Sequence, residues 1–286
     1  MTDLLKQTQE LCQTYGIKPA HSKGQNFLIK EEVYDKVVEA AEVSKDDVIL
    51  EVGPGLGFLT AKLAKKAKQV VAVEIDEKLA DFLKMAMVSQ KISNVAIVNE
   101  DVTKLSLNLG SSIKYKVAAN LPYNITSFFL RKFLTSGHRP ALMSILIQKE
   151  VAERIVAKAG NMSLLALSVQ FYADAEIIAN VPPESFWPAP KVDSAIIKIR
   201  TYGEQERATK GLTSLDEKKF FRLAKFGFSA KRKMLKNNLA AGFHITVPEA
   251  QAKIEKAGLD NKVRAEALSF EQWLGLYALW FESVGE

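Results

Sequence analysis

The chain has 286 residues, of which 48% are hydrophobic and 25% charged, and its net charge is +6. This composition is typical of a globular protein with one large or two modest domains. No stretch reaches the roughly 20 apolar residues of a membrane span, and the first residues lack the apolar run of a signal peptide. We therefore expect a cytoplasmic protein without a membrane partner.

Cysteine and histidine usage argues against disulfide and metal chemistry. The one cysteine, Cys12, has no internal partner for a disulfide. The three histidines, His21, His138 and His244, are scattered and lack the spacing of metal ligands. The sequence therefore predicts no metal site.

Strand and helix patterns alternate through the first part of the chain. Buried strands are expected at 48–52, 70–74, 95–98, 115–119 and 142–147, and helices at 58–67, at 77–89 and after Thr126. Strands that alternate with helices form a mainly parallel sheet with helices on both faces. The fold class predicted for this part is therefore α/β.

A glycine-rich stretch, 51–57, falls where the first buried strand should end. Gly53, Gly55 and Gly57 would let the backbone turn tightly and approach a ligand without a Cβ in the way. A strand followed by such a loop is typical of a nucleotide site. An isolated glycine pattern also fits an ordinary turn, so the motif alone leaves both interpretations open.

Two carboxylates follow at the ends of the next two strands. Glu74 lies about 20 residues beyond Gly53, where an acidic side chain can accept hydrogen bonds from both ribose hydroxyls. Asp101 follows the third strand and can accept from an exocyclic adenine amine. Either acid alone fits a loop carboxylate or a helix cap. Together with the glycine loop they favour a bound adenosine group, which nicotinamide dinucleotides and S-adenosylmethionine share.

The segment 120–123, Asn-Leu-Pro-Tyr, distinguishes between these two candidate cofactors and favours S-adenosylmethionine. Methylation of an exocyclic amine requires its delocalised lone pair to localise on nitrogen, and acceptors on the N–H groups favour this change. The Asn120 side-chain carbonyl can be one acceptor, Pro122 stiffens the turn, and Tyr123 offers a face for a flipped base. The alternative is a proline turn with a buried tyrosine.

Positive charge is concentrated in one segment near the C-terminus. Residues 207–240 contain ten Lys or Arg and two Asp or Glu, a net of +8 in a chain whose total is +6, so the rest carries −2. Apolar residues recur among these charges at helical spacing, which predicts helices with one buried and one basic face, suited to a phosphate backbone. A basic face that meets only solvent is the alternative. Residues 202–215, with two glycines, are predicted as a linker.

Together these motifs resemble the KsgA/RsmA family of small-subunit ribosomal RNA adenine dimethyltransferases, to which the erythromycin-resistance methyltransferases are related. The matching segments cover nearly the whole chain and comprise 24–28 (GQNFL), 51–57 (EVGPGLG), 73–76 (VEID), Asp101, 120–123 (NLPY) and 186–194 (FWPAPKVDS). The segment 228–239 is similar to the basic helical motif of the ribosome-assembly branch, and 264–268 to its C-terminal signature. Lys23 and Lys231 depart from the family pattern, in which Leu and Arg are commoner.

The resemblance implies a Rossmann-like class I methyltransferase domain at 1–203 and a small helical domain at 204–286 that contacts RNA. It implies S-adenosylmethionine as the cofactor, and N6 dimethylation of two adjacent adenines near the 3′ end of 16S rRNA. The implied partner is an assembling small ribosomal subunit, and the implied oligomeric state is a monomer.

The resemblance also implies the residues of the site. The cofactor-binding set comprises Asn26, Leu28, Gly53, Gly55, Glu74, Ile75, Asp101, Val102 and Asn120. The catalytic set at the target base comprises Asn120, Leu121, Tyr123 and Phe186, with Tyr123 and Phe186 on either side of the adenine. Without the resemblance, an aromatic residue before a proline turn, such as Phe186, would be assigned to the core.

Three other functions stay open at this point. One is a large-subunit methyltransferase of the erythromycin-resistance type, and another is a non-catalytic assembly factor on the same fold. A nicotinamide-dependent oxidoreductase is disfavoured, because no catalytic His, Tyr-Lys or Arg constellation is visible in the sequence.

Overall fold

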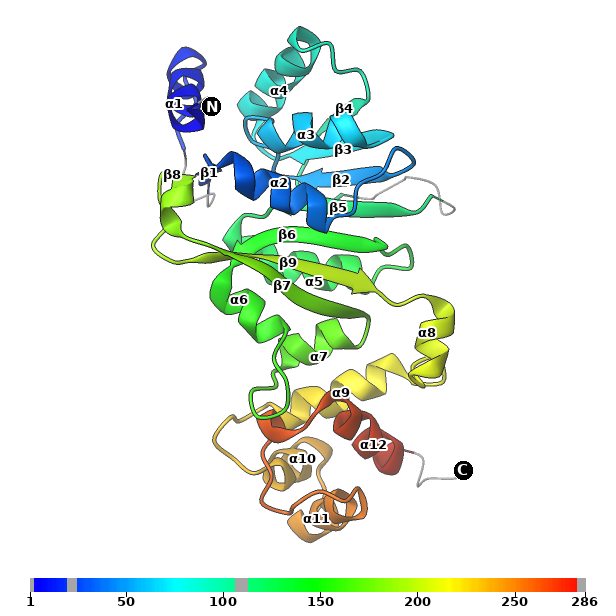
Figure 1. The fold of residues 1–286 in the computed structure, drawn as a ribbon. Helices are drawn as coiled ribbons and strands as arrows, with labels where there is room; N and C mark the ends of the chain where they lie inside the picture. The colour runs from blue at the N-terminus through cyan, green and yellow to red at the C-terminus, as the bar shows by residue number, and fades with distance from the viewer. Residues whose placement is uncertain (1–2, 20–24, 106–112, 282–286) are drawn as a thin grey trace. The chain divides into compact units, whose positions relative to one another are not determined.

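The computed structural model describes residues 3–19, 25–105 and 113–281, so Lys23 and Gly24 of the sequence motif, and His21, lie outside the described part. The chain divides into two compact units. The first unit comprises Met1–Ala152 and Asp174–Thr201, and the second comprises Glu153–Ala173 and Tyr202–Glu286 (Figure 1). The predicted boundary at 203/204 differs from this division, because residues 153–173 group with the C-terminal helices.

A seven-stranded sheet forms the centre of the first unit, in the order β4-β3-β2-β5-β6-β9-β7. The neighbours from β4 to β6 are parallel, and β6 pairs with β9 antiparallel. Its strands are β2 (Val48–Val52), β3 (Gln69–Glu74), β4 (Val95–Asn99), β5 (Tyr115–Asn120), β6 (Leu142–Gln148), β7 (Ala173–Val181) and β9 (Ser194–Thr201). The five expected strands are β2 to β6, and the mainly parallel α/β sheet is confirmed.

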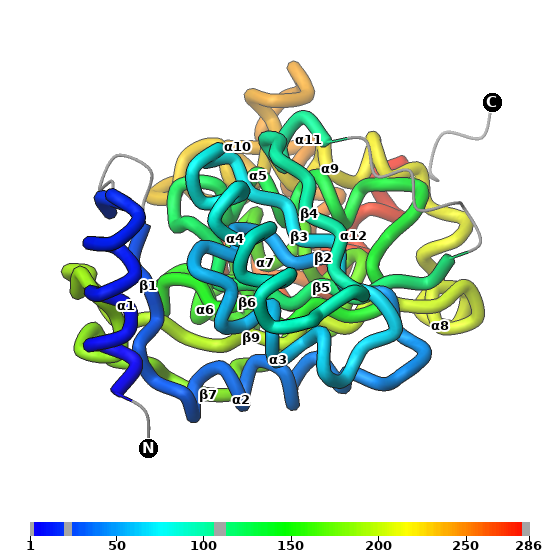
Figure 2. The backbone as a smooth tube through the Cα atoms, turned by 90° about the horizontal axis from the view of Figure 1, so that it is seen from above, coloured from blue at the N-terminus to red at the C-terminus, as the bar shows by residue number. Residues whose placement is uncertain are grey.

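Helices cover both faces of this sheet. They include α2 (Glu31–Ala40), α3 (Phe58–Lys66), α4 (Glu77–Ser89) and α5 (Thr126–Leu134). In both views α2 and α5 lie on opposite sides of the sheet (Figure 1, Figure 2). Because every residue of β2 is buried, the strand is uniformly apolar except at Glu51, as expected for a central strand with helices on both faces.

A second sheet of two short strands joins distant parts of the first unit. β1 (Phe27–Leu28) pairs antiparallel with β8 (Phe186–Trp187), so Leu28 lies opposite Phe186. The N-terminal helix α1 (Leu4–Thr14) buries Cys12 in a cluster that also contains Phe27. This pairing brings the two sequence motifs at 24–28 and 186–194 together.

The second unit is helical. Its elements are α7 (Leu164–Gln170), α8 (Glu204–Thr209), α9 (Glu217–Gly227), α10 (Leu235–Phe243), α11 (Val247–Lys256) and α12 (Phe270–Phe281), while α6 (Lys149–Ile155) spans the boundary. In α9, Phe220, Leu223, Ala224 and Gly227 are buried at helical spacing. Trp273 of α12 is fully buried and its ring stacks on Phe228.

Two expectations for this unit are wrong. The predicted linker 202–215 contains the helix α8, which begins after Gly203 and ends before Gly211. The segment 228–234 is a turn between α9 and α10, so only the second half of the predicted basic helical motif is helical. The Asn238 side chain explains the turn, because its Nδ2 donates to the carbonyls of Gly227 and Ala230, at 2.7 and 3.0 Å.

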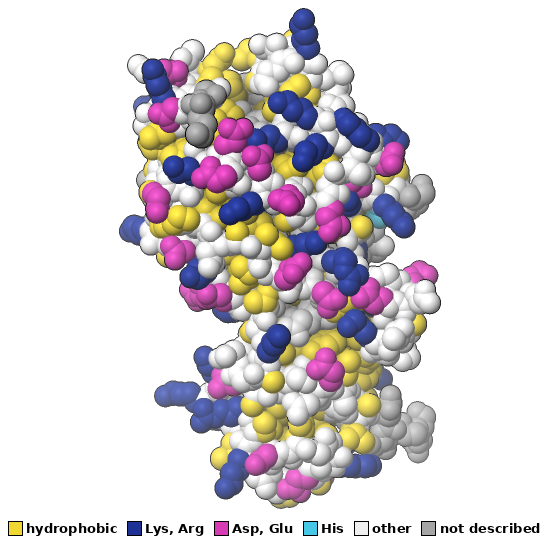
Figure 3. Space-filling model, in the orientation of Figure 1, with side chains coloured by type: hydrophobic (Ala, Val, Ile, Leu, Met, Phe, Trp, Pro, Cys, Tyr) yellow, Lys and Arg dark blue, Asp and Glu magenta, His cyan; other side chains and the backbone are white. Residues whose placement is uncertain are grey.

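The surface carries mixed charge over the first unit, where Lys and Arg side chains alternate with Asp and Glu on the face in Figure 3. No helix within the described part of the chain is long and apolar enough to cross a bilayer.

Candidate active site

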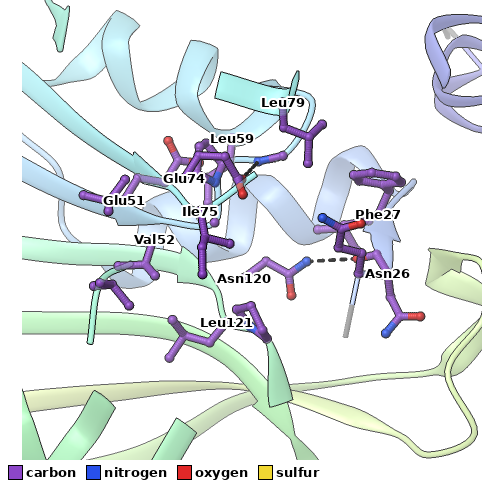
Figure 4. A pocket seen from close by; sticks show the side chains of 18 of the residues that line it. Asn26, Phe27, Glu51, Val52, Leu59, Glu74, Ile75, Leu79, Asn120 and Leu121 are labelled. Carbon is purple, nitrogen blue, oxygen red and sulfur yellow. Dashed lines mark hydrogen bonds between the residues drawn. The ribbon is translucent and has the colours of Figure 1, made fainter. Parts of the chain in front are cut away.

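A cavity of about 250 Å³ opens at the carboxyl ends of β2, β3, β4 and β5 in the first unit (Figure 4). Ligands of parallel α/β sheets bind at this edge, because the loops that follow the strands converge there. All the residues predicted for the site line this cavity: Asn26, Leu28, Gly53, Gly55, Glu74, Ile75, Asp101, Val102, Asn120, Leu121, Tyr123 and Phe186.

The glycine loop after β2 has the left-handed backbone that glycine tolerates best. Gly53, Gly55 and Gly57 have φ values of 67°, 56° and 82°. A Cβ on Gly57 would lie 2.4 Å from Leu83 Cδ1, so this residue also lets α3 pack closely against α4. Gly53 and Gly55 line the cavity, whereas Gly57 packs against α4.

Glu74, at the end of β3, is buried beside this loop. Its carboxylate accepts hydrogen bonds from the backbone N–H groups of Gly55, at 3.2 Å, and Asp76, at 3.0 Å. Burial raises the pKa of Glu74, while these hydrogen bonds act in the opposite direction. Since a carboxylate can accept about four hydrogen bonds, acceptor capacity remains for a ligand in the cavity.

Asp101 begins a tight turn after β4. Its Oδ1 accepts from the Thr103 N–H at 2.8 Å, and its carbonyl accepts from the N–H groups of Lys104 and Leu105. Hydrogen bonds from Thr103, first from the hydroxyl and then from the backbone, lower the pKa of Asp101. The side chain is therefore an ionised acceptor at the rim of the cavity.

Asn120 ends β5 and is oriented by the N-terminal motif. Its Nδ2 donates to the Asn26 carbonyl at 3.3 Å (Figure 4). Because the amide nitrogen is held on Asn26, the side-chain oxygen is turned the other way and stays free to accept a hydrogen bond in the cavity. Leu121 is buried, and its N–H donates to the Leu146 carbonyl, so the turn before Pro122 is tied to β6.

Two aromatic side chains reach the same cavity from different parts of the chain. The Tyr123 hydroxyl shares a 2.6 Å hydrogen bond with Ser194 Oγ, at the start of β9, and burial raises its pKa. Phe186 is only 3% exposed and belongs to the hydrophobic core as well as to the cavity wall. The core assignment and the site assignment of Phe186 are therefore compatible.

Glu51 and Tyr34 also line the cavity, although sequence reasoning gave them no role. Glu51 is 1% exposed, and its Oε2 has no hydrogen-bond partner among the described residues. Burial, with a smaller contribution from the Glu74 charge, raises the pKa of Glu51 to about 8. The signal in the sequence is a glutamate in an otherwise apolar strand. Burial of a carboxyl group costs free energy, so a glutamate at such a position is a candidate for a functional site.

Glu51 makes stability depend on pH. Its pKa rises from 4.5 in the unfolded chain to about 8 in the folded protein, so the folded state holds the proton between these values. The proton on Glu51 therefore adds to the free energy of unfolding. This contribution is complete below pH 4.5 and is lost as pH rises toward 8. We expect the melting temperature of Glu51→Gln, relative to the parent, to increase steadily from pH 5 to pH 8. A difference independent of pH would contradict the raised pKa, and exposed Glu100→Gln is the control.

The cavity suits a cationic nucleoside better than an anionic one. Glu74, Glu100 and Asp101 line it, together with the protonated carboxyl group of Glu51 and apolar side chains such as Ile75. S-adenosylmethionine, with its sulfonium centre, ribose hydroxyls and adenine, matches this combination of acids and apolar surface. Among the described residues, no group of three or more His, Cys, Asp or Glu could hold a metal ion.

The sheet order and this cavity define the class as a Rossmann-like methyltransferase that uses S-adenosylmethionine. The ribosomal RNA adenine dimethylase family model matches residues 18–281, and the chain belongs to that family. It is accordingly an S-adenosylmethionine-dependent enzyme that dimethylates N6 of adenine in ribosomal RNA.

Individual relatives agree with this assignment. The chain is 43% identical over 272 residues to ribosomal RNA small subunit methyltransferase A of Dehalococcoides mccartyi, covering 94% of this chain and 91% of the relative. A dimethyladenosine transferase from Plasmodium falciparum has a similar fold, with a TM-score of 0.76, 24% identity and coverage of 90% and 98%. The 23S rRNA methyltransferase ErmE has a TM-score of 0.71, 26% identity and coverage of 89% and 99%.

Proposed function

We propose that this enzyme dimethylates two adjacent adenines near the 3′ end of small-subunit rRNA, acting as a cytoplasmic monomer on an assembling small subunit. The observation that carries the proposal is the meeting of Asn120, Tyr123 and Phe186 in the acid-lined cavity. The name of the Dehalococcoides relative, a small subunit methyltransferase, favours this RNA over the large-subunit RNA named for ErmE.

In this proposal the acids and glycines hold the cofactor. Glu74 accepts from the ribose hydroxyls, Asp101 accepts from the adenine amine, and Ile75 and Val102 lie against the adenine ring. The backbone of Gly53 and Gly55, with Asn26 and Leu28, encloses the remainder. S-adenosylmethionine supplies a methyl group already activated on sulfonium sulfur, so the protein has to align rather than activate it.

Asn120 acts on the target amine. Its side-chain oxygen accepts an N–H from the adenine N6, which helps the lone pair to localise on nitrogen. As the methyl–nitrogen bond forms, the methyl–sulfur bond would break to leave S-adenosylhomocysteine, and the methylated nitrogen would then lose a proton to water. The Asn26 carbonyl supports this orientation by holding the Asn120 nitrogen at 3.3 Å. Preorganised acceptors of this kind stabilise the charge that develops in the transition state, so no strong base is required.

Tyr123 and Phe186 hold the flipped base between them. The hydrogen bond between the Tyr123 and Ser194 hydroxyls fixes the edge of the ring and leaves its face for stacking. Leu121, buried at the turn, limits the space beside the amine. After the first transfer one N–H remains, and stacking keeps the monomethylated base in place for the second.

The overall function is tested with small subunits that lack these methyl groups. Incubation with S-adenosylmethionine, followed by mass-spectrometric mapping, should give dimethyladenine at two adjacent positions near the 3′ end of the small-subunit rRNA. Modification of large-subunit RNA instead would favour the resistance activity. Tight binding of the particle without methyl transfer would favour a non-catalytic assembly factor.

The basic turn between α9 and α10 is proposed to bind RNA. Three cations are exposed there, Lys231, Arg232 and Lys233. The Lys231 Nζ forms a long ion pair of 4.0 Å with Glu266 Oε2. Asn238 holds the backbone at the start of this turn through the carbonyls of Gly227 and Ala230. A backbone held in this way lowers the ordering cost of binding phosphates.

Neutralising Lys231, Arg232 and Lys233 with glutamine should weaken binding to small subunits and flatten its salt dependence, because each phosphate contact releases counterions on binding. The affinity for free S-adenosylmethionine should not change. A matched control neutralises Lys65, Lys66 and Lys68, which are also exposed, on the first unit. If both triple variants change the salt slope alike, the turn is only a solvated surface.

A further inference from the structure

Lys132 of α5 makes an unusual set of hydrogen bonds. Its Nζ donates to three backbone carbonyls of one turn, those of Val102 at 3.0 Å, Thr103 at 2.9 Å and Leu105 at 2.7 Å. An ammonium group has three N–H donors and no acceptor, so all of its hydrogen-bonding capacity is used within the protein. The side chain is half-buried, and its ammonium group is committed to this turn.

The turn that Lys132 caps carries the proposed adenine contacts. Its first residue, Asp101, accepts from the N–H groups of Thr103, Lys104 and Leu105 through its side chain and carbonyl. These bonds satisfy N–H donors, but among the described residues no backbone N–H donates to the carbonyls of Val102, Thr103 and Leu105, as at the end of a helix. A cation at that end stabilises such carbonyls, and Lys132 supplies it from a neighbouring helix.

We infer that Lys132 is a positioning residue for adenine recognition: by fixing the carbonyls of Val102, Thr103 and Leu105, it directs Asp101 toward the exocyclic amine of the cofactor. This inference rests on the proposed role of Asp101. It makes the acceptor rigid, and a rigid acceptor discriminates between a base that offers an amine and one that offers a carbonyl. Lys132 also contributes to the lowered pKa of Asp101, behind the larger effect of Thr103.

The test compares two ligands, S-adenosylhomocysteine and its deaminated analogue, in which hypoxanthine replaces adenine. Lys132→Met keeps the length of the side chain but removes the donors. We expect its affinity for S-adenosylhomocysteine to fall about tenfold, the loss of a charge-assisted hydrogen bond, with little change for the analogue. The ratio of the two affinities should shrink accordingly. The KM for S-adenosylmethionine should rise while kcat at saturation stays near the parent value.

Lys116→Met is the matched control. Lys116 on β5 also donates to a backbone carbonyl, that of Glu42 at 2.6 Å, and pairs with Asp47 at 2.9 Å. Its loss should lower the melting temperature without changing the ratio of the two ligand affinities. A purely structural role for Lys132 would give the same pattern and would overturn the inference.

Two further variants separate the possible failures. If Lys132→Met does not fold, Lys132→Gln is used instead, because its amide can still donate to part of the turn. Its ratio of the two ligand affinities should lie between those of the parent and of Asp101→Ala. A parental ratio would overturn the inference. Asp101→Ala tests the underlying proposal, because it should abolish the preference for adenine. If Asp101→Ala keeps the preference, the adenine role of Asp101 is wrong. If it loses the preference and Lys132→Met does not, only the role of Lys132 is wrong.

Discussion

Asn120→Ala should lower the rate constants of both methyl transfers by about 10²- to 10³-fold, the usual cost of removing one preorganised group that stabilises developing charge. Its hydrogen bond to the amine strengthens as the nitrogen changes geometry, so the loss falls on the transition state more than on the bound ground state. Affinity for S-adenosylmethionine should change little. Single-turnover assays on unmodified small subunits, with the adenine products resolved by mass spectrometry, measure each step separately.

Asn124→Ala is the matched control for Asn120→Ala. Asn124 has the same side chain and lines the same cavity, but no role in the reaction is proposed for it. Asn120→Asp adds a second comparison, because aspartate keeps a side-chain acceptor but cannot donate to the Asn26 carbonyl. Its rates should fall between those of the alanine variant and the parent. Parental rates in Asn120→Ala would rule out the acceptor mechanism.

Glu74→Ala should weaken S-adenosylmethionine binding by about 1 to 3 kcal/mol, the range for losing hydrogen bonds to a charged group, as measured by calorimetry. The structure adds a second source of loss, because the Glu74 carboxylate also holds the N–H groups of Gly55 and Asp76. Glu74→Gln retains one acceptor oxygen and should lose less affinity than the alanine variant.

Glu100→Ala tests whether any acid of the cavity would give the same result. Glu100 also lines the cavity but is exposed, so its loss should reduce affinity only through weak, screened electrostatics. If Glu74→Ala folds and binds S-adenosylmethionine as tightly as the parent, Glu74 has no role at the ribose. Circular dichroism of each variant checks that folding is intact.

The residues at strand ends could be predicted from the sequence because parallel strands have a regular geometry. Glu74 and Asn120 end strands with a strong apolar pattern, and Gly53 and Asp101 follow such strands. The carboxyl ends of parallel strands meet at one edge of the sheet. Local periodicity therefore determined both the elements and their common location. The order of strands and helices in the sequence was therefore enough to predict that these side chains line one cavity.

The remaining wall of the cavity depends on contacts between distant segments, which periodicity does not reveal. Phe186 reaches the cavity because β8 pairs with the two-residue strand β1, and only the family resemblance indicated it. The bond between Tyr123 and Ser194 spans 71 positions. Lys132 donates hydrogen bonds to carbonyls about 30 positions earlier in the chain. The sequence pattern of its helix does not distinguish it from a lysine that faces solvent. The turn at 228–234 depends likewise on Asn238 in the following helix.

The second unit takes its residues from two separate stretches of the chain, and this interleaving limits how the gene can be divided or recombined. Phe171 packs its ring against Phe220, Tyr172 donates to Glu217, and the N–H groups of Gly160 and Met162 donate to the Glu266 carbonyl. A truncation after residue 203 would leave 153–173 without these partners and expose its apolar side chains. A functional exchange of this unit between relatives therefore has to transfer 153–173 and 202–286 as a pair, so single-crossover chimaeras should misfold where double replacements succeed.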